Sequence, residues 1–185
     1  AVTVHAKTED QSPFASAAAQ DWVRLARAAD IFNLMTYDYT NRNEPPGPVA
    51  SIPWVGEVVE YALTTTTSER VRVGLPFYGY SWRRGRPPAT ATTWEAADRM
   101  VTQFGLEPQR DPLGHELAIE LDVTGLPRQQ LFVSDAQTTS ARLDVLPAVG
   151  GVAIWGIGGE DPANWQVLRD QRPAPCALRE GAAGR

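Results

Sequence analysis

The sequence predicts an α/β fold made of parallel strand-helix units, on three observations. Short apolar or β-branched runs alternate along the chain with stretches whose apolar residues recur at helical spacing. Successive runs are separated by enough chain for a helical crossover, and not by a two-residue hairpin turn. The chain has 185 residues, of which 43% are hydrophobic and 21% charged, which suits one domain with its own core.

The expected strands are short and hydrophobic, and they lie at residues 2–6, 31–39, 71–78 and 151–157. The helices between them carry an apolar stripe, and they are expected at residues 17–29, 53–63 and 140–146. A last helix is expected to begin at Asp161 and Pro162, which fit an N-cap followed by proline at the first helical position.

The alternation breaks between the third and fourth strands, where residues 83–133 are predicted to form a small α+β insertion. Thr92 and Glu95 fit a capping box that begins a helix, which ends near residue 104. Two strand-like runs follow the helix, at residues 116–121 and 130–133. We expect residues 1–170 to form one domain and residues 171–185 to be a disordered tail, because that segment has no periodicity.

Four parallel strands make an incomplete sheet. They leave two unpaired edges, and a closed (β/α)8 barrel needs about 250 residues. The sequence therefore leaves two architectures open: half of a larger fold, or a doubly wound domain with four strands. Because the chain starts directly in a strand-like run without an initiating Met, we expect a processed or truncated product.

Composition argues against several classes of protein. The formal net charge of −5 argues against nucleic acid as the main partner. The longest apolar runs are far shorter than the roughly 18–20 residues that span a bilayer, so no membrane span is expected. The one cysteine, Cys176, and two distant histidines, His5 and His115, give no metal-ligand spacing. No metal or organic cofactor is predicted.

Polar and aromatic side chains gather where the second expected strand ends. Met35, Tyr37 and Tyr39 share one face by the period of two of a strand, and Asp38 stands where the strand gives way to a loop. The carboxyl ends of parallel strands are where such folds place their sites. The alternative interpretation is structural, with a tyrosine that lines a barrel and an aspartate that caps a loop.

Two further strand ends carry aromatic side chains. Tyr78 and Trp82 belong to a group of four aromatic residues, and their flat faces suit sugar rings or bases. Trp155 ends the last strand beside glycines that leave room for a ligand above the indole. The structural alternatives are a small core inside the insertion for Tyr78 and Trp82, and barrel filling for Trp155.

Three segments carry a resemblance to a known family. Residues 35–39 (MTYDY), 74–82 (GLPFYGYSW) and 151–162 (GVAIWGIGGEDP) resemble glycoside hydrolase family 18, the chitinase family. The chain is most similar to the bacterial branch of spore-cortex and peptidoglycan glucosaminidases, over roughly residues 1–168. The resemblance implies a TIM barrel of which this chain supplies strands five to eight, with the insertion after strand seven.

The resemblance also implies an activity. The family hydrolyses β-1,4 bonds next to N-acetylglucosamine, in chitin or peptidoglycan, by substrate-assisted catalysis. Tyr37 would hydrogen-bond the N-acetyl group as it becomes an oxazolinium ion, and Asp38 would bind the substrate near the scissile bond. Met35 and Trp155 would line the −1 subsite. The implied substrate-binding residues are Met35, Tyr78, Trp82 and Trp155, of which Tyr78 and Trp82 would shape the neighbouring cleft.

The family's acidic signature, Asp-x-x-Asp-x-Asp-x-Glu, does not occur in this sequence. We therefore expect the general acid to be absent and the chain alone to be inactive, with the other barrel half coming from an upstream segment, a partner or self-association. Two alternatives remain at this stage: a non-catalytic chitinase-like carbohydrate-binding protein, and a half-barrel with a structural role. By analogy with the family, the protein is expected outside the cell or in the cell envelope.

Overall fold

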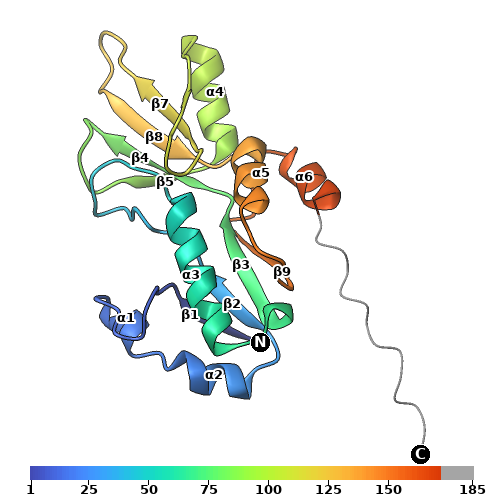
Figure 1. Cartoon of the computed structure of the whole chain (residues 1–185). Helices are drawn as coiled ribbons and strands as arrows, with labels where there is room; N and C mark the ends of the chain where they lie inside the picture. The colour runs from blue at the N-terminus through green and yellow to red at the C-terminus, as the bar shows by residue number, and fades with distance from the viewer. Residues whose placement is uncertain (172–185) are drawn as a thin grey trace, which may run out of the picture.

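The computed structural model describes residues 1–171, which form two β-sheets arranged end to end (Figure 1). The first sheet is parallel, and neighbouring strands follow the order β1-β2-β3-β9. Its strands are β1 (Val2–His5), β2 (Phe32–Met35), β3 (Val71–Pro76) and β9 (Gly151–Trp155). The predicted parallel strands are confirmed, and each is shorter than the apolar run that predicted it.

Two helices cover one face of this sheet, α2 (Trp22–Ala28) and α3 (Ile52–Thr65), and α3 lies across the strands in Figure 1. The side chains that alternate along the strands pack against these helices in one core, which includes Val4, Phe32, Leu34, Val71, Val73, Val55, Val58 and Val59. On the other face, Thr3 is exposed, and Asn33 and Arg72 are half-buried. The sheet therefore buries one face within the described residues.

The strand order decides between the two architectures that the sequence left open. A doubly wound domain needs a point at which the strand order reverses. Here the spatial order follows the chain order, so the doubly wound interpretation is wrong. The sheet does not close on itself within residues 1–171, and β1 and β9 form its two edges.

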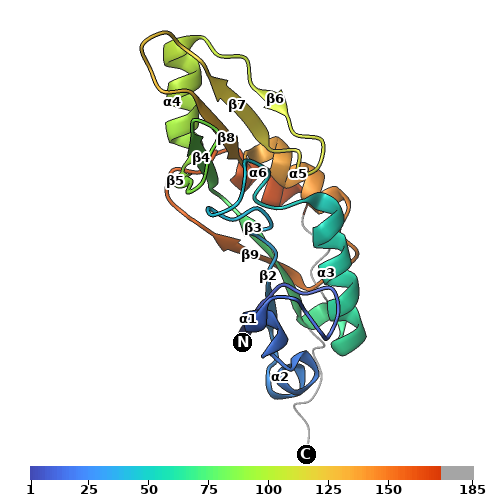
Figure 2. The same cartoon turned by 90° about the vertical axis from the view of Figure 1, so that its left-hand side faces the viewer.

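The second sheet is antiparallel, in the order β5-β4-β8-β7-β6. Its strands are β4 (Gly79–Arg83), β5 (Thr90–Thr92), β6 (Gln109–Arg110), β7 (Leu117–Leu121) and β8 (Gln129–Val133). Helix α4 (Trp94–Phe104) packs on one face through Ala97, which meets Ile119 and Leu131. Because β4 follows β3 directly, this sheet stands at the carboxyl ends of the parallel strands (Figure 2).

The described chain has four elements besides these: α1 (Ala15–Ala18), the 3-10 turn η1 (Ser68–Arg70), α5 (Ala136–Asp144) and α6 (Asn164–Asp170). Helices α5 and α6 pack side by side, and the buried Thr139 hydroxyl of α5 donates a hydrogen bond to the Asn164 side chain at 2.6 Å. Helix α5 connects the second sheet to β9, and α6 follows β9.

The stretch predicted as one helix over residues 17–29 is two helices, α1 and α2. The Asp21 carboxylate accepts the backbone N–H of Arg24 at 2.9 Å and begins α2 as an N-cap. The apolar stripe did not reveal this break, because residues on both sides of the cap keep helical spacing. The cap of α4 also differs from the prediction: it is Thr93 and not Thr92.

The helix predicted at residues 140–146 begins earlier, at Ala136. Asp135 begins it, because its carboxylate accepts an N–H of the first turn. Helix α6 begins two residues after the predicted Pro162, and Asp161 instead accepts the N–H of Ala163 at 2.9 Å. The predicted disordered tail lies outside the described residues, apart from Gln171.

Candidate active site

Three parallel strands bring predicted site residues together at their carboxyl ends. Tyr37 follows β2, Tyr78 follows β3 and Trp155 ends β9. The Tyr37 ring stacks on the Trp155 ring, with centroids 6.2 Å apart and planes 13° apart, and meets the Tyr78 ring edge-on at 6.5 Å. Trp155 is 60% exposed, so part of this aromatic cluster is open to a ligand.

Asp38 receives two tyrosine hydroxyls on one oxygen. The Tyr78 hydroxyl donates to Asp38 Oδ1 at 2.5 Å, and the Tyr80 hydroxyl donates to the same atom at 2.8 Å. Within residues 1–171, Oδ2 has no hydrogen-bond partner. The backbone of Asp38 has a φ of 59°, in the left-handed region that aspartate tolerates better than most residues. The two donors therefore fix the carboxylate and leave one oxygen for a ligand.

The tyrosines around Asp38 keep their protons at neutral pH. Burial raises the pKa of Tyr78 far above its ordinary value, and the hydrogen bond to the Asp38 carboxylate raises it further. Burial and the same carboxylate raise the pKa of Tyr80 to about 12. The pKa of Tyr37 is also raised, first by burial and then by the Asp38 charge. All three hydroxyls therefore remain hydrogen-bond donors.

Two glycines allow the aromatic cluster to form. A Cβ at Gly74 would overlap the carbonyl oxygen of Leu34 and stand 2.9 Å from Tyr37 Cε1, so glycine lets the Tyr37 ring lie close to β3. Gly156 has a φ of +88°, which favours glycine, and a Cβ there would stand 3.0 Å from Tyr78 Cδ1. Glycine at position 156 therefore lets the Tyr78 ring lie close to the end of β9.

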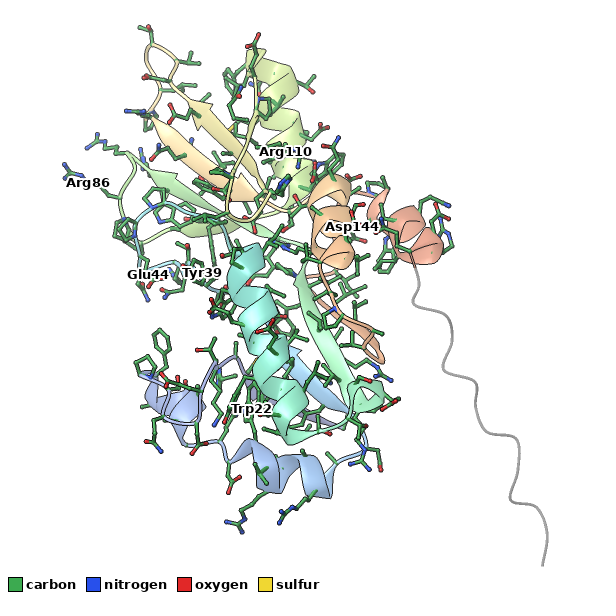
Figure 3. The ribbon with its side chains drawn as sticks, viewed as in Figure 1. Trp22, Tyr39, Glu44, Arg86, Arg110 and Asp144 are labelled. Carbon is green, nitrogen blue, oxygen red and sulfur yellow. The ribbon has the colours of Figure 1, made fainter. Side chains whose placement is uncertain are left out.

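A cavity of about 790 Å³ opens beside the cluster, at the ends of β1 and β2. Met35, Tyr37 and Asp38 line it, as their shared strand end predicts. Further lining residues come from the N-terminal segment, from the loop after β2 and from α3, and include Lys7, Phe14, Tyr39, Glu44 and Trp54. Figure 3 shows Tyr39 and Glu44 on the flank of the molecule where this cavity opens.

Trp82 lies elsewhere than the sequence suggested. It is fully buried in a cluster with Val49, Tyr80 and Ala89, and its Nε1 donates to the Glu44 carbonyl at 2.7 Å. A buried indole offers no face to a sugar ring, so the prediction of a direct ligand contact for Trp82 is corrected. The structural alternative, a small core at the insertion, describes this residue.

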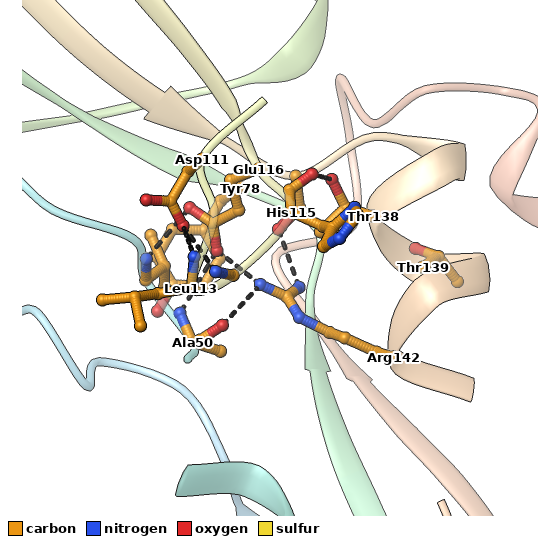
Figure 4. Close-up of polar contacts among 12 residues, drawn as sticks. Ala50, Tyr78, Asp111, Leu113, His115, Glu116, Thr138, Thr139 and Arg142 are labelled. Carbon is orange, nitrogen blue, oxygen red and sulfur yellow. Dashed lines mark hydrogen bonds and ion pairs between the residues drawn. The ribbon is translucent and has the colours of Figure 1, made fainter. Parts of the chain in front are cut away.

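A buried ion pair anchors the loop that carries Tyr37 and Asp38. Glu116 is fully buried, accepts the N–H groups of Val49 (2.9 Å) and Ala50 (3.2 Å) and pairs with Arg142 of α5 (Figure 4). The Arg142 guanidinium also donates to the Ala50 carbonyl at 3.1 Å. Burial raises the pKa of Glu116, although Arg142 and the two amides act in the opposite direction. The loop after β2 is therefore tied to both the second sheet and α5.

Sequence reasoning missed Tyr80, Glu116 and Arg142. The spacing of Tyr78 and Tyr80 could have indicated two side chains on one face, had residues 79–83 been recognised as a strand. For Glu116 and Arg142 no local signal exists, because isolated charged residues are far more often exposed.

Within residues 1–171, no three or more His, Cys, Asp or Glu side chains gather as a metal-ion site would need. In the same range, no helix has the length and apolar character required to cross a bilayer.

The model of the family Glycosyl hydrolases family 18 matches residues 1–159. The chain belongs to this family. The family predicted from three short motifs is thereby confirmed. Among curated relatives, the Cortical fragment-lytic enzyme of Bacillus subtilis (strain 168) is 28% identical to this family 18 chain over 159 residues, covering 83% of the chain and 37% of the relative.

Solved structures share the fold. The Bacillus cereus spore cortex-lytic enzyme SleL matches with a TM-score of 0.83 at 23% identity, over 91% of this chain and 40% of that one. A chitinase from Chromobacterium violaceum ATCC 12472 matches with a TM-score of 0.82 at 23% identity, over 91% of this chain and 54% of the chitinase. This family 18 chain thus spans 37% to 54% of these three proteins, and its α/β fold is TIM-barrel-like, with a sheet that stays open within residues 1–171.

Proposed function

We propose that this chain forms half of the catalytic cleft of a glycoside hydrolase that cleaves β-1,4-linked N-acetylglucosamine glycans, either chitin or peptidoglycan. The observation that carries the proposal is the cluster of Tyr37, Asp38 and Trp155 at the carboxyl ends of parallel strands in a family 18 chain. Barrel enzymes place their reacting groups at this end. An exposed indole beside a fixed carboxylate suits a sugar ring with its hydroxyl groups.

The proposed mechanism is substrate-assisted and retaining. The carbonyl oxygen of the substrate's N-acetyl group attacks the anomeric carbon, and the glycosidic bond breaks as a general acid from the other barrel half protonates the leaving oxygen. Water then opens the oxazolinium ion and gives the product with retained configuration. The protonated Tyr37 hydroxyl hydrogen-bonds the N-acetyl group during this step. Asp38 contacts the substrate near the scissile bond through Oδ2, since Oδ1 holds two tyrosine hydroxyls. Met35 and Trp155 line the −1 subsite, and Tyr78 shapes the adjoining cleft.

We infer that β1, β2, β3 and β9 correspond to barrel strands five to eight, with the second sheet inserted after strand seven. Two features support this assignment. The sheet leaves both edges unpaired within residues 1–171. Its face opposite α2 and α3 carries half-exposed side chains, as expected where a barrel interior lacks its other half.

The general acid is proposed to lie in a part of the fold that this sequence does not contain. The acidic signature of the family is absent from residues 1–185. General acid catalysis is worth roughly 10²- to 10⁴-fold in rate. We therefore propose that the isolated chain is inactive or nearly so, and that the other barrel half comes from an upstream segment, a partner or a second copy.

An activity comparison tests this function. The chain and a form extended upstream by about 150 residues, roughly half a barrel, are assayed on an N-acetylglucosamine oligomer with a chromogenic leaving group. Activity should appear in the extended form and fall on Tyr37→Phe. Tyr61→Phe, which removes a hydroxyl of α3 outside the cleft, serves as the matched control. Equal activity of the Tyr37→Phe and unmodified proteins would contradict the role of Tyr37.

A carbohydrate-binding protein without hydrolysis is the second candidate. The exposed Trp155 indole supports it, because an aromatic face can hold a sugar ring without hydrolysis. An extended protein that is inactive, yet binds the oligomer and loses binding on Trp155→Ala, would decide for this candidate. Either function places the protein outside the cell or in the cell envelope, where such glycans occur.

A further inference from the structure

Four exposed arginines lie around the end of β4 in the second sheet, and we call them the arginine surface: Arg42, Arg83, Arg84 and Arg86. Within residues 1–171, none of the four forms an ion pair or a side-chain hydrogen bond. Arg128, also exposed, lies next to them and pairs with Glu120 at 3.1 Å. The arginine surface therefore presents four positive charges that have no ion-pair partner within the described residues.

Backbone hydrogen bonds hold these arginines near one another although they come from different segments. The Ala89 N–H donates to the Arg42 carbonyl at 2.7 Å, which joins the loop after β2 to the start of β5. The Arg84 N–H donates to the Arg128 carbonyl at 2.6 Å, which closes the end of β4 on the start of β8. The backbone of the arginine surface is thus held in the fold at the end of β4.

The arginine surface adjoins the proposed cleft. Arg42 lies between Asn41 and Glu44, which both line the cavity. The charge of Arg42 also reaches the Tyr80 hydroxyl, where it opposes the rise in pKa that burial and Asp38 cause. Figure 3 shows Arg86 projecting from the same flank that carries Glu44. A polymer lying in the cavity would therefore continue toward these guanidinium groups.

The charge of the surface runs against that of the chain, whose formal net charge is −5. Guanidinium groups bind carboxylates through paired N–H donors, and exposed cations attract anions over about 10 Å at ordinary salt. Chitin carries no charge, whereas the peptide branches of peptidoglycan carry carboxylates along the glycan strand. Four cations without an ion-pair partner beside a glycan cleft can therefore bind the carboxylates of peptidoglycan, whereas chitin offers them no charged group.

We infer that the arginine surface binds peptide carboxylates of an anionic glycan strand that lies in the cleft, so that the chain selects peptidoglycan over chitin. The inference rests on the proposed function, because it assumes that a glycan occupies the cavity. It adds a subsite outside the aromatic cluster, on the insertion side of the cleft.

The test compares two double variants of the whole chain with equal charge change. Arg84→Gln with Arg86→Gln removes half of the arginine surface. Arg24→Gln with Arg27→Gln removes two exposed arginines of α2 and serves as the control. Circular dichroism verifies that both variants fold. Binding is measured by calorimetry with soluble uncrosslinked peptidoglycan strands, the same strands with amidated peptide carboxylates, and N-acetylchitohexaose.

The unmodified chain should bind the free-carboxylate strands more tightly than the amidated strands, and this preference should shrink as salt rises. Removing Arg84 and Arg86 should weaken binding of the free-carboxylate strands about 5-fold, as expected for two exposed ion pairs. Binding of chitohexaose should not change, and the control variant should match the unmodified chain.

Equal affinity for free and amidated strands would overturn the inference, as would an equal loss in the control variant. Tighter arginine-dependent binding of a teichoic acid or of a short DNA duplex would overturn it as well, in favour of a phosphate polymer. Chitohexaose binding that depends on Trp155 reports on the cleft alone. The experiment therefore separates failure of the proposed glycan cleft from failure of the proposed carboxylate binding by the arginine surface.

Discussion

Replacing Arg142 with methionine should lower the free energy of unfolding by about 3–5 kcal/mol, the cost of leaving one partner of a buried ion pair uncompensated. Arg142 and Glu116 have side chains that are 1% and 0% exposed. The guanidinium donates to Glu116, to the Ser134 hydroxyl at 2.9 Å and to the Ala50 carbonyl. After the substitution, the Glu116 carboxylate would keep two backbone amides and no opposite charge.

The loss should depend on pH, and its sign follows from Glu116. Burial already raises the pKa of this carboxyl, and removing the Arg142 charge would raise it further. Folding then favours the protonated form of Glu116, because its pKa is higher in the folded than in the unfolded chain. The resulting stabilisation is complete at a pH below the unfolded pKa. It is lost as the pH rises through the folded pKa. The variant should therefore be less destabilised near pH 4 than at pH 7.

Urea unfolding followed by tryptophan fluorescence measures both quantities. Arg99→Met is the matched control, because its partner Glu95 and Arg99 itself are 59% and 66% exposed, and such pairs contribute at most about 0.5 kcal/mol. The double variant Glu116→Gln, Arg142→Met should be more stable at pH 7 than Arg142→Met alone, since no buried charge remains. A cost for Arg142→Met no larger than that of Arg99→Met, or one independent of pH, would refute the reasoning.

Four further outcomes are expected. Asp38→Asn should lower the pKa of Tyr80 from about 12 toward its ordinary value, because a neighbouring negative charge is removed, and ultraviolet difference titration measures it. Gly74→Ala should cost about 1–3 kcal/mol, because its Cβ would overlap the backbone of β2. Gly56→Ala, in α3 with no atom within 4 Å of the new Cβ, should gain about 0.5–1 kcal/mol in the same urea assay. Burial by itself raises the pKa of Asp135, but the hydrogen bonds that it accepts hold it below its ordinary value, so its stabilisation is lost as pH falls. Asp135→Asn should therefore reduce the fall in melting temperature as the pH is lowered. An equal fall in the variant and the unmodified chain would contradict this.

The parallel strands could be predicted because burial on one face leaves apolar residues at regular places in the sequence. Strand β4 could not be predicted in this way. Only two residues separate it from β3, and no turn signal marks the boundary. Its aromatic residues were therefore assigned to a strand end. The strand at residues 79–83 buries Trp82 in a small core and brings Tyr80 to Asp38, which the pattern of a strand end does not predict.

The sequence predicts some of the side-chain contacts in the site and not others. Tyr37, Tyr78 and Trp155 come from successive strand ends, and parallel strands bring such ends to one edge. The ion pair between Glu116 and Arg142 could not be foreseen, because 26 positions separate the partners and the packing of three elements decides their burial. Tertiary contacts of this kind leave no periodicity in a sequence.

The second sheet helps to position Asp38 and the loop after β2. Asp38 lies in the loop after β2, yet the hydroxyl of Tyr80 that holds it comes from β4. The buried Trp82, also of β4, donates to the carbonyl of Glu44 in the same loop. Because these contacts tie β4 to the loop at Asp38 itself and again at Glu44, a shift of the second sheet would move the carboxylate. Trp82 therefore bears on the cleft through the loop that it holds and not through contact with a ligand.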